Sequence, residues 1–322
     1  MYQLNNMKKN SFVWSCFVMT FFVACQQADV ENLEAGKLLM SISASINGQI
    51  ESKSRYAITD LQHLAFTDGD NIGLFIDGKK AIQWIYDGTD WSTAENKVVY
   101  WPDKSKEHTF HAFYPYAEAT SLESVPMPDL SSQDGTFENI ADYDFLVATS
   151  CQTYGEGGVV DFTGETTSFK HVSTLLKFTF LEGEDLDEML INKVVLKGGN
   201  IVAPTTYSFA ENGGVALNPN NLSDVLTVSP INQTEFYMIV NENKTQNPTV
   251  ELTVEYEANG KTYVAKSENF VKAGFVGGMC QGYTITIQNS SLIIEDAVIM
   301  PWGIGENLGD IFINGEEKVG TE

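Results

Sequence analysis

Residues 38–46 read LLMSISASI, and this stretch decides the fold class. Apolar and small polar side chains alternate along it, and a period of two residues predicts a strand with one buried face. The residues that we expect to point inward are Leu38, Met40, Ile42, Ala44 and Ile46. Further short apolar or alternating runs, separated by Gly, Asn and Asp, follow along the chain.

The alternation is clearest at residues 250–257, which read VELTVEYE and lead into Asn259-Gly260. Asn-Gly and Asp-Gly pairs favour two-residue hairpin turns, and Asp87-Gly88 predicts a second hairpin. Helix is expected only in two short pieces, at residues 59–64 and 185–190. Many short strands with almost no helix indicate an all-β protein of sandwich architecture.

The N-terminus has the features of a secretory signal. Lys8 and Lys9 precede an apolar run of 13 residues that ends at Ala24, whereas a transmembrane helix needs about 20. Cys25 follows, as in a bacterial lipobox, where the cysteine is acylated (palmitate is an expected chain) and becomes the first mature residue. Phe22 stands where Leu is usual, and an ordinary cleavage site is the alternative. We predict a signal peptide over residues 1–24 and a lipid-anchored tether over residues 25–36.

Composition excludes several classes of partner. The net charge of −24 disfavours nucleic acid and anionic lipid headgroups, while 43% hydrophobic residues suffice for large cores. Arg55 is the only arginine, so bidentate recognition of phosphates is not expected. Only Cys151 and Cys280 remain beyond the anchor candidate, and no spacing rule decides whether they pair.

Residues with catalytic or metal-binding potential are few. The histidines are His63, His108, His111 and His171, and a separation of three places the middle two on opposite faces of a strand. The acidic pair at residues 68–70 is interpreted as a turn, with a calcium loop as the alternative. No nucleophile elbow, zinc-binding helix or phosphate loop is present. We predict no enzymatic activity, no cofactor and no metal site.

Four tryptophans of the mature chain leave a second function open. They would either pack in the core or form an exposed platform on which sugar rings stack. The second arrangement would make the protein a surface glycan-binding lipoprotein. The four residues are Trp84, Trp91, Trp101 and Trp302.

Seven short motifs, in order along the mature chain, resemble the fimbrillin family of Gram-negative bacterial lipoproteins, including its small-fimbria-like branch. They are Gly69–Phe75, Tyr100–Pro102, Phe113–Tyr116, Phe169–His171, Leu175–Phe178, Gly282–Ile287 and Ile299–Gly303. The resemblance implies two tandem transthyretin-like, Greek-key β-sandwich domains. We place the N-terminal domain at residues 37–167 and the C-terminal domain at residues 168–305, with an acidic tail over residues 306–322.

The resemblance also implies an assembly route, in which a surface protease cuts after an arginine near the N-terminus. The cut frees the first strand, and a neighbouring subunit's strand fills the vacated groove. Here the cut would fall between Arg55 and Tyr56, and the displaced strand would be residues 38–46. The donor strand is less clear, because Ile311–Ile313 is short and its surroundings are acidic.

The expected function is therefore a stalk, tip or anchor component of a surface fimbria used in adhesion. Its partners would be other fimbrial subunits, the outer membrane through the lipid at Cys25, and ligands on host or bacterial surfaces. No nucleic acid partner is expected.

Overall fold

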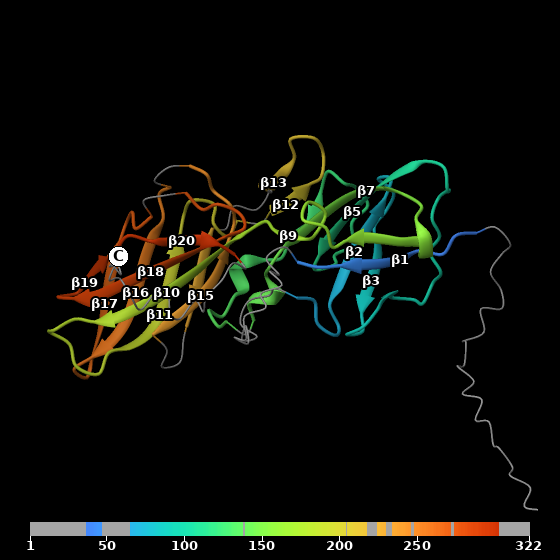
Figure 1. Ribbon diagram of the computed structural model, residues 1–322. Helices are drawn as coiled ribbons and strands as arrows, with labels where there is room; N and C mark the ends of the chain where they lie inside the picture. The colour runs from blue at the N-terminus through green and yellow to red at the C-terminus, as the bar shows by residue number, and fades with distance from the viewer. Residues whose placement is uncertain are drawn as a thin grey trace, which may run out of the picture. The chain divides into compact units, whose positions relative to one another are not determined.

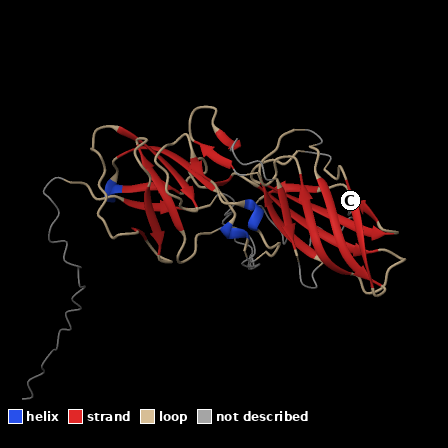
Figure 2. Cartoon of the chain, turned by 180° about the vertical axis from the view of Figure 1, so that it is seen from behind, coloured by secondary structure: helices blue, strands red, loops and turns tan. Residues whose placement is uncertain are grey.

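The computed structural model describes residues 37–46 and 65–302, except residues 138, 204, 218–223, 230–233, 246–247 and 272–273. Along these residues the chain forms twenty strands and three short 3-10 turns, which confirms the all-β fold class (Figures 1 and 2). The described residues from Leu38 onward belong to one compact unit. None of their helices is long and apolar enough to cross a membrane.

The first large sheet has six antiparallel strands in the order β4-β3-β2-β5-β7-β9. Its strands are β2 (Asn71–Ile76), β3 (Ile82–Tyr86), β4 (Trp91–Thr93), β5 (Glu107–Tyr114), β7 (Leu146–Thr153) and β9 (Lys170–His171). The hairpin predicted at Asp87-Gly88 is confirmed, because Tyr86 pairs with Trp91 across it. The sheet continues past residue 167, since β9 is its last strand.

Both faces of this sheet are covered. On one face lie β1 (Ser41–Ala44) and β8 (Val159–Phe162), which form a two-stranded sheet. On the other face lie β6 (Val125–Pro126), β12 (Thr205–Ser208) and β13 (Gly214–Leu217), in the order β13-β12-β6. Separate hydrophobic clusters fill the two spaces. A sheet with two buried faces explains why β2 is a nearly continuous apolar run and why Ala112, Phe113 and Tyr114 of β5 are buried in succession.

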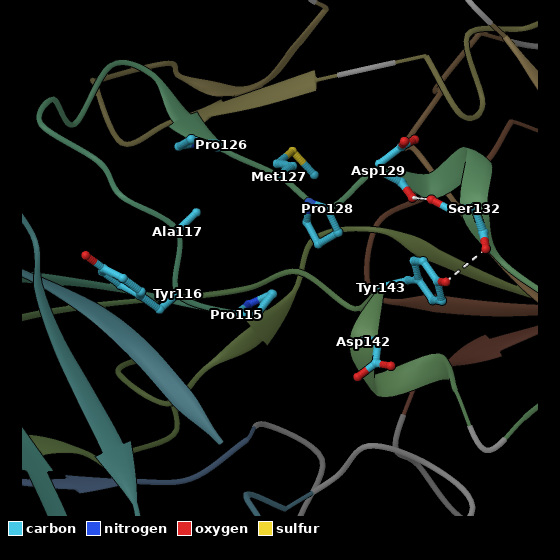
Figure 3. A pocket seen from close by; sticks show the side chains of 10 residues that line it. All are labelled: Pro115, Tyr116, Ala117, Pro126, Met127, Pro128, Asp129, Ser132, Asp142 and Tyr143. Atoms are coloured by element: carbon cyan, nitrogen blue, oxygen red, sulfur yellow. Dashed lines mark hydrogen bonds between the residues drawn. The ribbon is translucent and has the colours of Figure 1, made fainter. Parts of the chain in front are cut away.

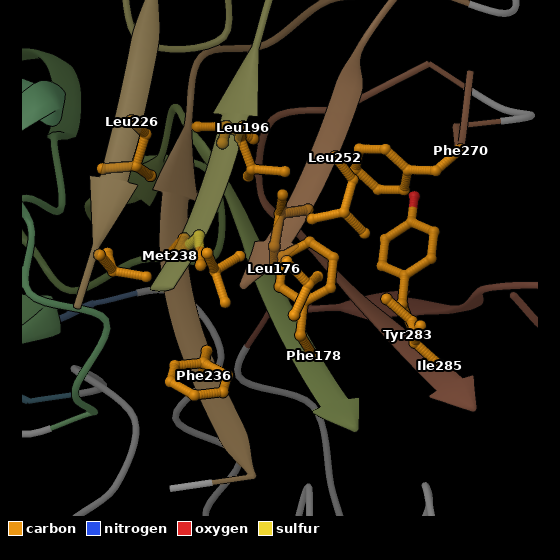
Figure 4. Packing of buried hydrophobic residues seen from close by; sticks show 14 of the residues in the cluster. Leu176, Phe178, Leu196, Leu226, Phe236, Met238, Leu252, Phe270, Tyr283 and Ile285 are labelled. Carbon is orange, nitrogen blue, oxygen red and sulfur yellow. The ribbon is translucent and has the colours of Figure 1, made fainter. Parts of the chain in front are cut away.

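Two further sheets pack face to face around the largest hydrophobic cluster of the described residues (Figure 4). We call this pair of sheets the second sandwich, and the six-stranded sheet with its two covering sheets the first. One sheet has the order β15-β10-β18-β19, with β20 also pairing with β18, and the other has the order β14-β11-β16-β17. Their strands are β10 (Thr174–Glu182), β11 (Leu190–Lys197), β14 (Val225–Val228), β15 (Glu235–Val240), β16 (Glu251–Ala258), β17 (Lys261–Ser267), β18 (Met279–Gln288), β19 (Ser291–Ile294) and β20 (Val298–Pro301).

Alternation along β16 is as predicted from the sequence. Val250, Leu252, Val254 and Tyr256 are fully buried, and the intervening residues are half-buried or exposed. Asn259 and Gly260 both have positive φ, at 51° and 68°, and they join β16 to β17 in the predicted hairpin.

A strap, residues 129–143, runs between β6 and β7 and contains the 3-10 turns η1 (Leu130–Ser132) and η2 (Ile140–Asp142). Its Leu130 and Ile140 are buried in the core of the second sandwich. The Gln133 Nε2 donates to the Ile239 carbonyl at 2.8 Å, and the Ile239 N–H donates to Gln133 Oε1 at 2.6 Å. Since β15 is the outer strand of its sheet, this amide takes the place of a neighbouring strand.

The helix expected at residues 185–190 is wrong. Leu190 and Ile191 belong to β11, where they pair with Glu257 and Tyr256 of β16. Only Leu186 and Met189 are left to form an apolar stripe, which is too little to stabilise a helix on the surface. The residues before β11 form turns instead. The other short helix, at residues 59–64, lies outside the described residues.

Candidate functional site

The site predicted at the first strand is a groove in the first half of the chain. Strand β1 pairs in parallel with β8, from Ser41 opposite Val159 to Ala44 opposite Phe162. The residues of the two strands are more than a hundred apart in the sequence, so no local turn holds them together. We call the surface that receives residues 38–46 the strand groove.

Backbone hydrogen bonds extend the seat of this strand in both directions. Towards its start, the Met40 N–H donates to the Val99 carbonyl at 3.0 Å, and the Trp101 N–H donates to the Leu38 carbonyl at 2.9 Å. The strand therefore passes from one neighbour, residues 99–101, to a second neighbour, β8. Each neighbour contributes part of a ladder, and neither is joined to the strand by a short turn.

Towards its end, the strand pairs with the end of β8 and then with Phe169. The Ser45 N–H donates to the Phe162 carbonyl at 3.1 Å, and the Phe169 N–H donates to the Ser45 carbonyl at 2.9 Å. Ile46 forms an isolated parallel bridge with Phe169. The backbone pairing thus covers the whole stretch that the alternation picked out.

Inward side chains of the strand complete a hydrophobic cluster. Met40, Ile42 and Ile46 are only 7%, 8% and 1% exposed to solvent. Leu38 and Ala44 are partly buried against the same cluster. Leu39, on the other face, is 41% exposed. The cluster is rich in aromatic rings from the sheet, from β8 and from the two segments that pair with the ends of the strand: Trp84, Trp91, Trp101, Phe110, Phe162 and Phe169.

Gly158 permits the close approach of the strand to its groove. It lies immediately before β8, in the 3-10 turn η3 (Glu156–Gly158), with φ at +68°. A Cβ atom there would overlap the Leu39 carbonyl oxygen. The Gly158 carbonyl also accepts a hydrogen bond from Trp101 Nε1 at 2.7 Å. Gly158 therefore links the segment 99–101 to β8, at the point where the strand stops pairing with the first and begins pairing with the second.

Other residues of the predicted site lie outside the described residues. These are the acylation candidate Cys25, the scission pair Arg55 and Tyr56, and the donor candidate Ile311–Ile313. Of the predicted site, the structure therefore describes only the strand and the groove in which it lies.

The four tryptophans do not form an exposed platform. Trp84, Trp91, Trp101 and Trp302 are 3%, 9%, 4% and 4% exposed, so each packs inside a core. The alternative that they stack on sugars at the surface is wrong. Burying a large apolar ring stabilises the folded chain, and each of the four rings is buried.

His108 and His111 point to opposite faces of β5, as their spacing predicts. His108 is buried beside Trp101, and its Nδ1 lies 2.8 Å from Asp77 Oδ2. His111 contacts the Phe209 ring on the other side, and burial lowers its pKa. The described ranges contain no group of three side chains that could hold a metal ion. At residues 68–70 the chain turns, with Gly69 N–H donating to Tyr86 O at 2.9 Å.

The two remaining cysteines are free thiols. Cys151 is exposed on β7, and Cys280 is buried in β18. Burial raises the pKa of the Cys280 thiol to about 12, so it stays protonated at physiological pH. The open question of their pairing is thereby answered, because neither forms a disulfide.

A shallow hollow of about 330 Å³ lies beside the strap (Figure 3). Half of its lining residues are prolines and tyrosines, and the others are Ala117, Met127, Ser132 and the carboxylates Asp129 and Asp142. The Tyr143 hydroxyl donates to the Ser132 carbonyl at 3.0 Å and closes one side. In Figure 3 the Tyr116 ring points away from Asp129 and Asp142, so the polar groups do not converge on one ligand position.

Comparison of the sequence with known families gives one match, to the fimbrillin-like family, over residues 57–302. That range covers most of the chain and includes the groove residues 99–101 and 158–169. The chain belongs to the fimbrillin-like family. No curated protein matches the sequence.

Two solved structures show the same fold as this fimbrillin-like chain. A presumed cell adhesion protein from Bacteroides uniformis aligns with a TM-score of 0.55 at 16% identity, over 83% of this chain and 98% of that one. A second, from Bacteroides ovatus, has a TM-score of 0.54 at 18% identity, over 84% and 98%. The tip fimbrial protein Mfa3 from Porphyromonas gingivalis aligns at 0.47 and 12% identity, over 83% and 100%.

Several residues of the fimbrillin-like groove could not be identified from the sequence. Alternation marks the strand, but its partner β8 and the bridging Gly158 lie far along the chain. Gly157-Gly158 before Val159-Val160 was the available signal, because adjacent glycines often mark a close backbone approach.

Proposed function

We propose that this protein is a structural, tip or anchor subunit of a cell-surface fimbria that serves adhesion. Membership of the fimbrillin-like family supports the assignment to fimbriae. The observation that carries the proposal further is the seat of residues 38–46, a strand with an inward apolar row that lies in a groove built from distant parts of the chain.

Proteolysis at Arg55-Tyr56 would turn this groove into an acceptor site. Arg55 follows Ile46 by nine residues and is the only arginine, so an arginine-specific protease can cut the chain at one bond only. The cut would leave the strand held by backbone pairing and by three buried side chains. Each such side chain contributes about 1.5–3 kcal/mol when it is buried.

Loss of the strand would leave apolar surface and unpaired backbone groups on β8 exposed to water. A strand from a neighbouring subunit would restore both the burial and the hydrogen bonds. Subunits joined in this way form a polymer. We further propose two sandwich domains, with the strand groove in the first, and we place the passage of the chain to the second after β9 and not at residue 167, because β9 belongs to the first sheet.

Acylation at Cys25 would hold the uncut protein at the outer membrane. A single acyl chain binds membranes reversibly, so stable anchoring requires more than one chain on the mature N-terminus. Cleavage after Arg55 would then release the protein from its lipid, and an uncut copy would remain at the base as an anchor. Beyond other subunits, we propose ligands on host or bacterial surfaces as partners.

The assembly step is tested on the mature chain with an arginine-specific protease. The digest is run on a gel without boiling, and Arg55→Lys serves as the matched control because it keeps the charge. We expect a ladder of oligomers for the wild type and none for the control. A cleaved chain that has lost residues 25–55 and remains monomeric would contradict the proposal.

Acylation is tested separately by labelling cells with a palmitate analogue. The label should be lost in Cys25→Ala and retained in Cys16→Ala, which changes a cysteine inside the signal. Equal labelling of the two variants would rule out Cys25 as the anchor.

A further inference from the structure

Three residues from distant parts of the chain meet at the end of β20. Asp144 lies between η2 and β7, His171 ends β9, and Trp302 follows the last residue of β20. The His171 Nδ1 lies 2.9 Å from Asp144 Oδ2, and the His171 and Trp302 rings stack with centroids 4.1 Å apart and planes 6° apart. Their exposed fractions are 0%, 8% and 4%.

Strand β20 alone is weakly held. It pairs with β18 over four residues, and one of these, Pro301, has no N–H to donate. Val298 and Ile299 are 41% and 43% exposed, so they bury little apolar surface. Trp302, by contrast, is almost fully buried, and its backbone N–H donates to the Gly278 carbonyl at 2.8 Å. Among the side chains of residues 298–302 whose burial the structure describes, the indole ring of Trp302 is therefore the main apolar contribution.

Ring stacking, rather than hydrogen bonding, joins His171 to Trp302. Within the described residues neither His171 Nε2 nor Trp302 Nε1 has a hydrogen-bond partner. The orientation of the imidazole is set through its other nitrogen, by Asp144. A ring held at one atom presents a flat face to the indole, and loss of that bond would let it rotate about χ2.

We propose that Asp144, His171 and Trp302 form a clasp that holds the C-terminal arm, defined as residues 298–302, against the first sheet. The clasp decides whether the arm stays docked, because the pairing of β20 with β18 is too short to retain it. Opening of the clasp would free the arm and withdraw Trp302 from the edge of the second sandwich's hydrophobic cluster, while the strands of both sandwiches remain folded.

Hydrogen exchange measured by mass spectrometry on the full mature chain tests this proposal. Peptides covering residues 296–302 report the arm, and peptides within β10 report opening of the core. In His171→Ala and Trp302→Ala we expect exchange of the arm amides to rise by about tenfold or more, with a much smaller rise in β10. Asp144→Asn should have a smaller effect in the same direction, because an asparagine still accepts from Nδ1.

His108→Ala is the matched control, since His108 is also buried, bonded to an aspartate and packed beside a tryptophan. It should leave exchange of the arm amides unchanged. The double variant His171→Ala/Trp302→Ala should exceed Trp302→Ala by little, because both remove the same stack. Unchanged arm exchange in His171→Ala, an equal rise in β10, or an equal effect of His108→Ala would each overturn the proposal. If Trp302→Ala fails to fold, Trp302→Phe, which keeps a ring, supplies the comparison with His171→Ala.

Discussion

Replacement of Gly158 by alanine should selectively weaken the binding of the N-terminal strand, residues 38–46, in its groove. The position has φ at +68°, where a side chain costs about 1–2 kcal/mol. The new Cβ would also overlap the Leu39 carbonyl oxygen, and forcing extra atoms into a packed site costs about 1–3 kcal/mol more. Only the second cost depends on residues 38–46.

Gly157→Ala separates the two costs. Gly157 has φ at +79°, so its backbone strain is similar, yet a Cβ there would meet only Val159 Cγ2 at 3.8 Å. Urea unfolding of the two variants should therefore show Gly158→Ala to be less stable than Gly157→Ala by about 1–3 kcal/mol, at an unchanged m-value. Equal free energies of unfolding would refute the inference that Gly158 is needed for the strand to lie in its groove.

Three further predictions concern stability. Ile46→Ala should lower the free energy of unfolding by about 2–5 kcal/mol because Ile46 is buried, whereas Leu39→Ala on the exposed face should change it by about 0.5 kcal/mol or less; equal losses would show that the inward row is misassigned. Gln133→Ala should cost about 1–3 kcal/mol, because it leaves the buried Ile239 backbone groups unpaired, and a neutral result in urea unfolding would contradict the role of the strap. Burial lowers the pKa of His111, so the unfolded chain binds its proton at a higher pH than the native chain; stability should fall as pH drops through about 6.5, and His111→Gln should flatten that fall in pH-dependent melting curves.

The sequence predicts local structure well where neighbours in the chain also pair in space. Alternation at residues 250–257 and the turn at Asn259-Gly260 are sufficient to specify the β16–β17 hairpin, because both its strands and its turn lie within one stretch. Alternation at residues 38–46 likewise identifies the buried face of the first strand. In each case the signal is the period of two that a half-buried strand requires.

Contacts between distant segments could not be predicted in the same way. The parallel pairing of β1 with β8 involves no local turn, so no turn motif in the sequence indicates it. The side-chain amide of Gln133 pairs with the backbone of β15 as a strand would, although the residues around it have no strand pattern. The stack of His171 on Trp302 joins two short motifs that the sequence marks only as separate pieces. The helix expected at residues 185–190 was wrong because pairing with β16 recruited Leu190 into a strand.

Exchange of the N-terminal strand is the central claim, and a labelled peptide tests it directly. Mature protein cut at Arg55 is mixed with a fluorescent peptide of residues 37–47, and fluorescence anisotropy follows its uptake. A control peptide carries serine at positions 40, 42 and 46, so that it keeps the backbone and loses the buried row. The account predicts uptake of the first peptide alone, by the cut protein and not by uncut Arg55→Lys. Cut protein that takes up neither peptide, or both equally, would contradict it.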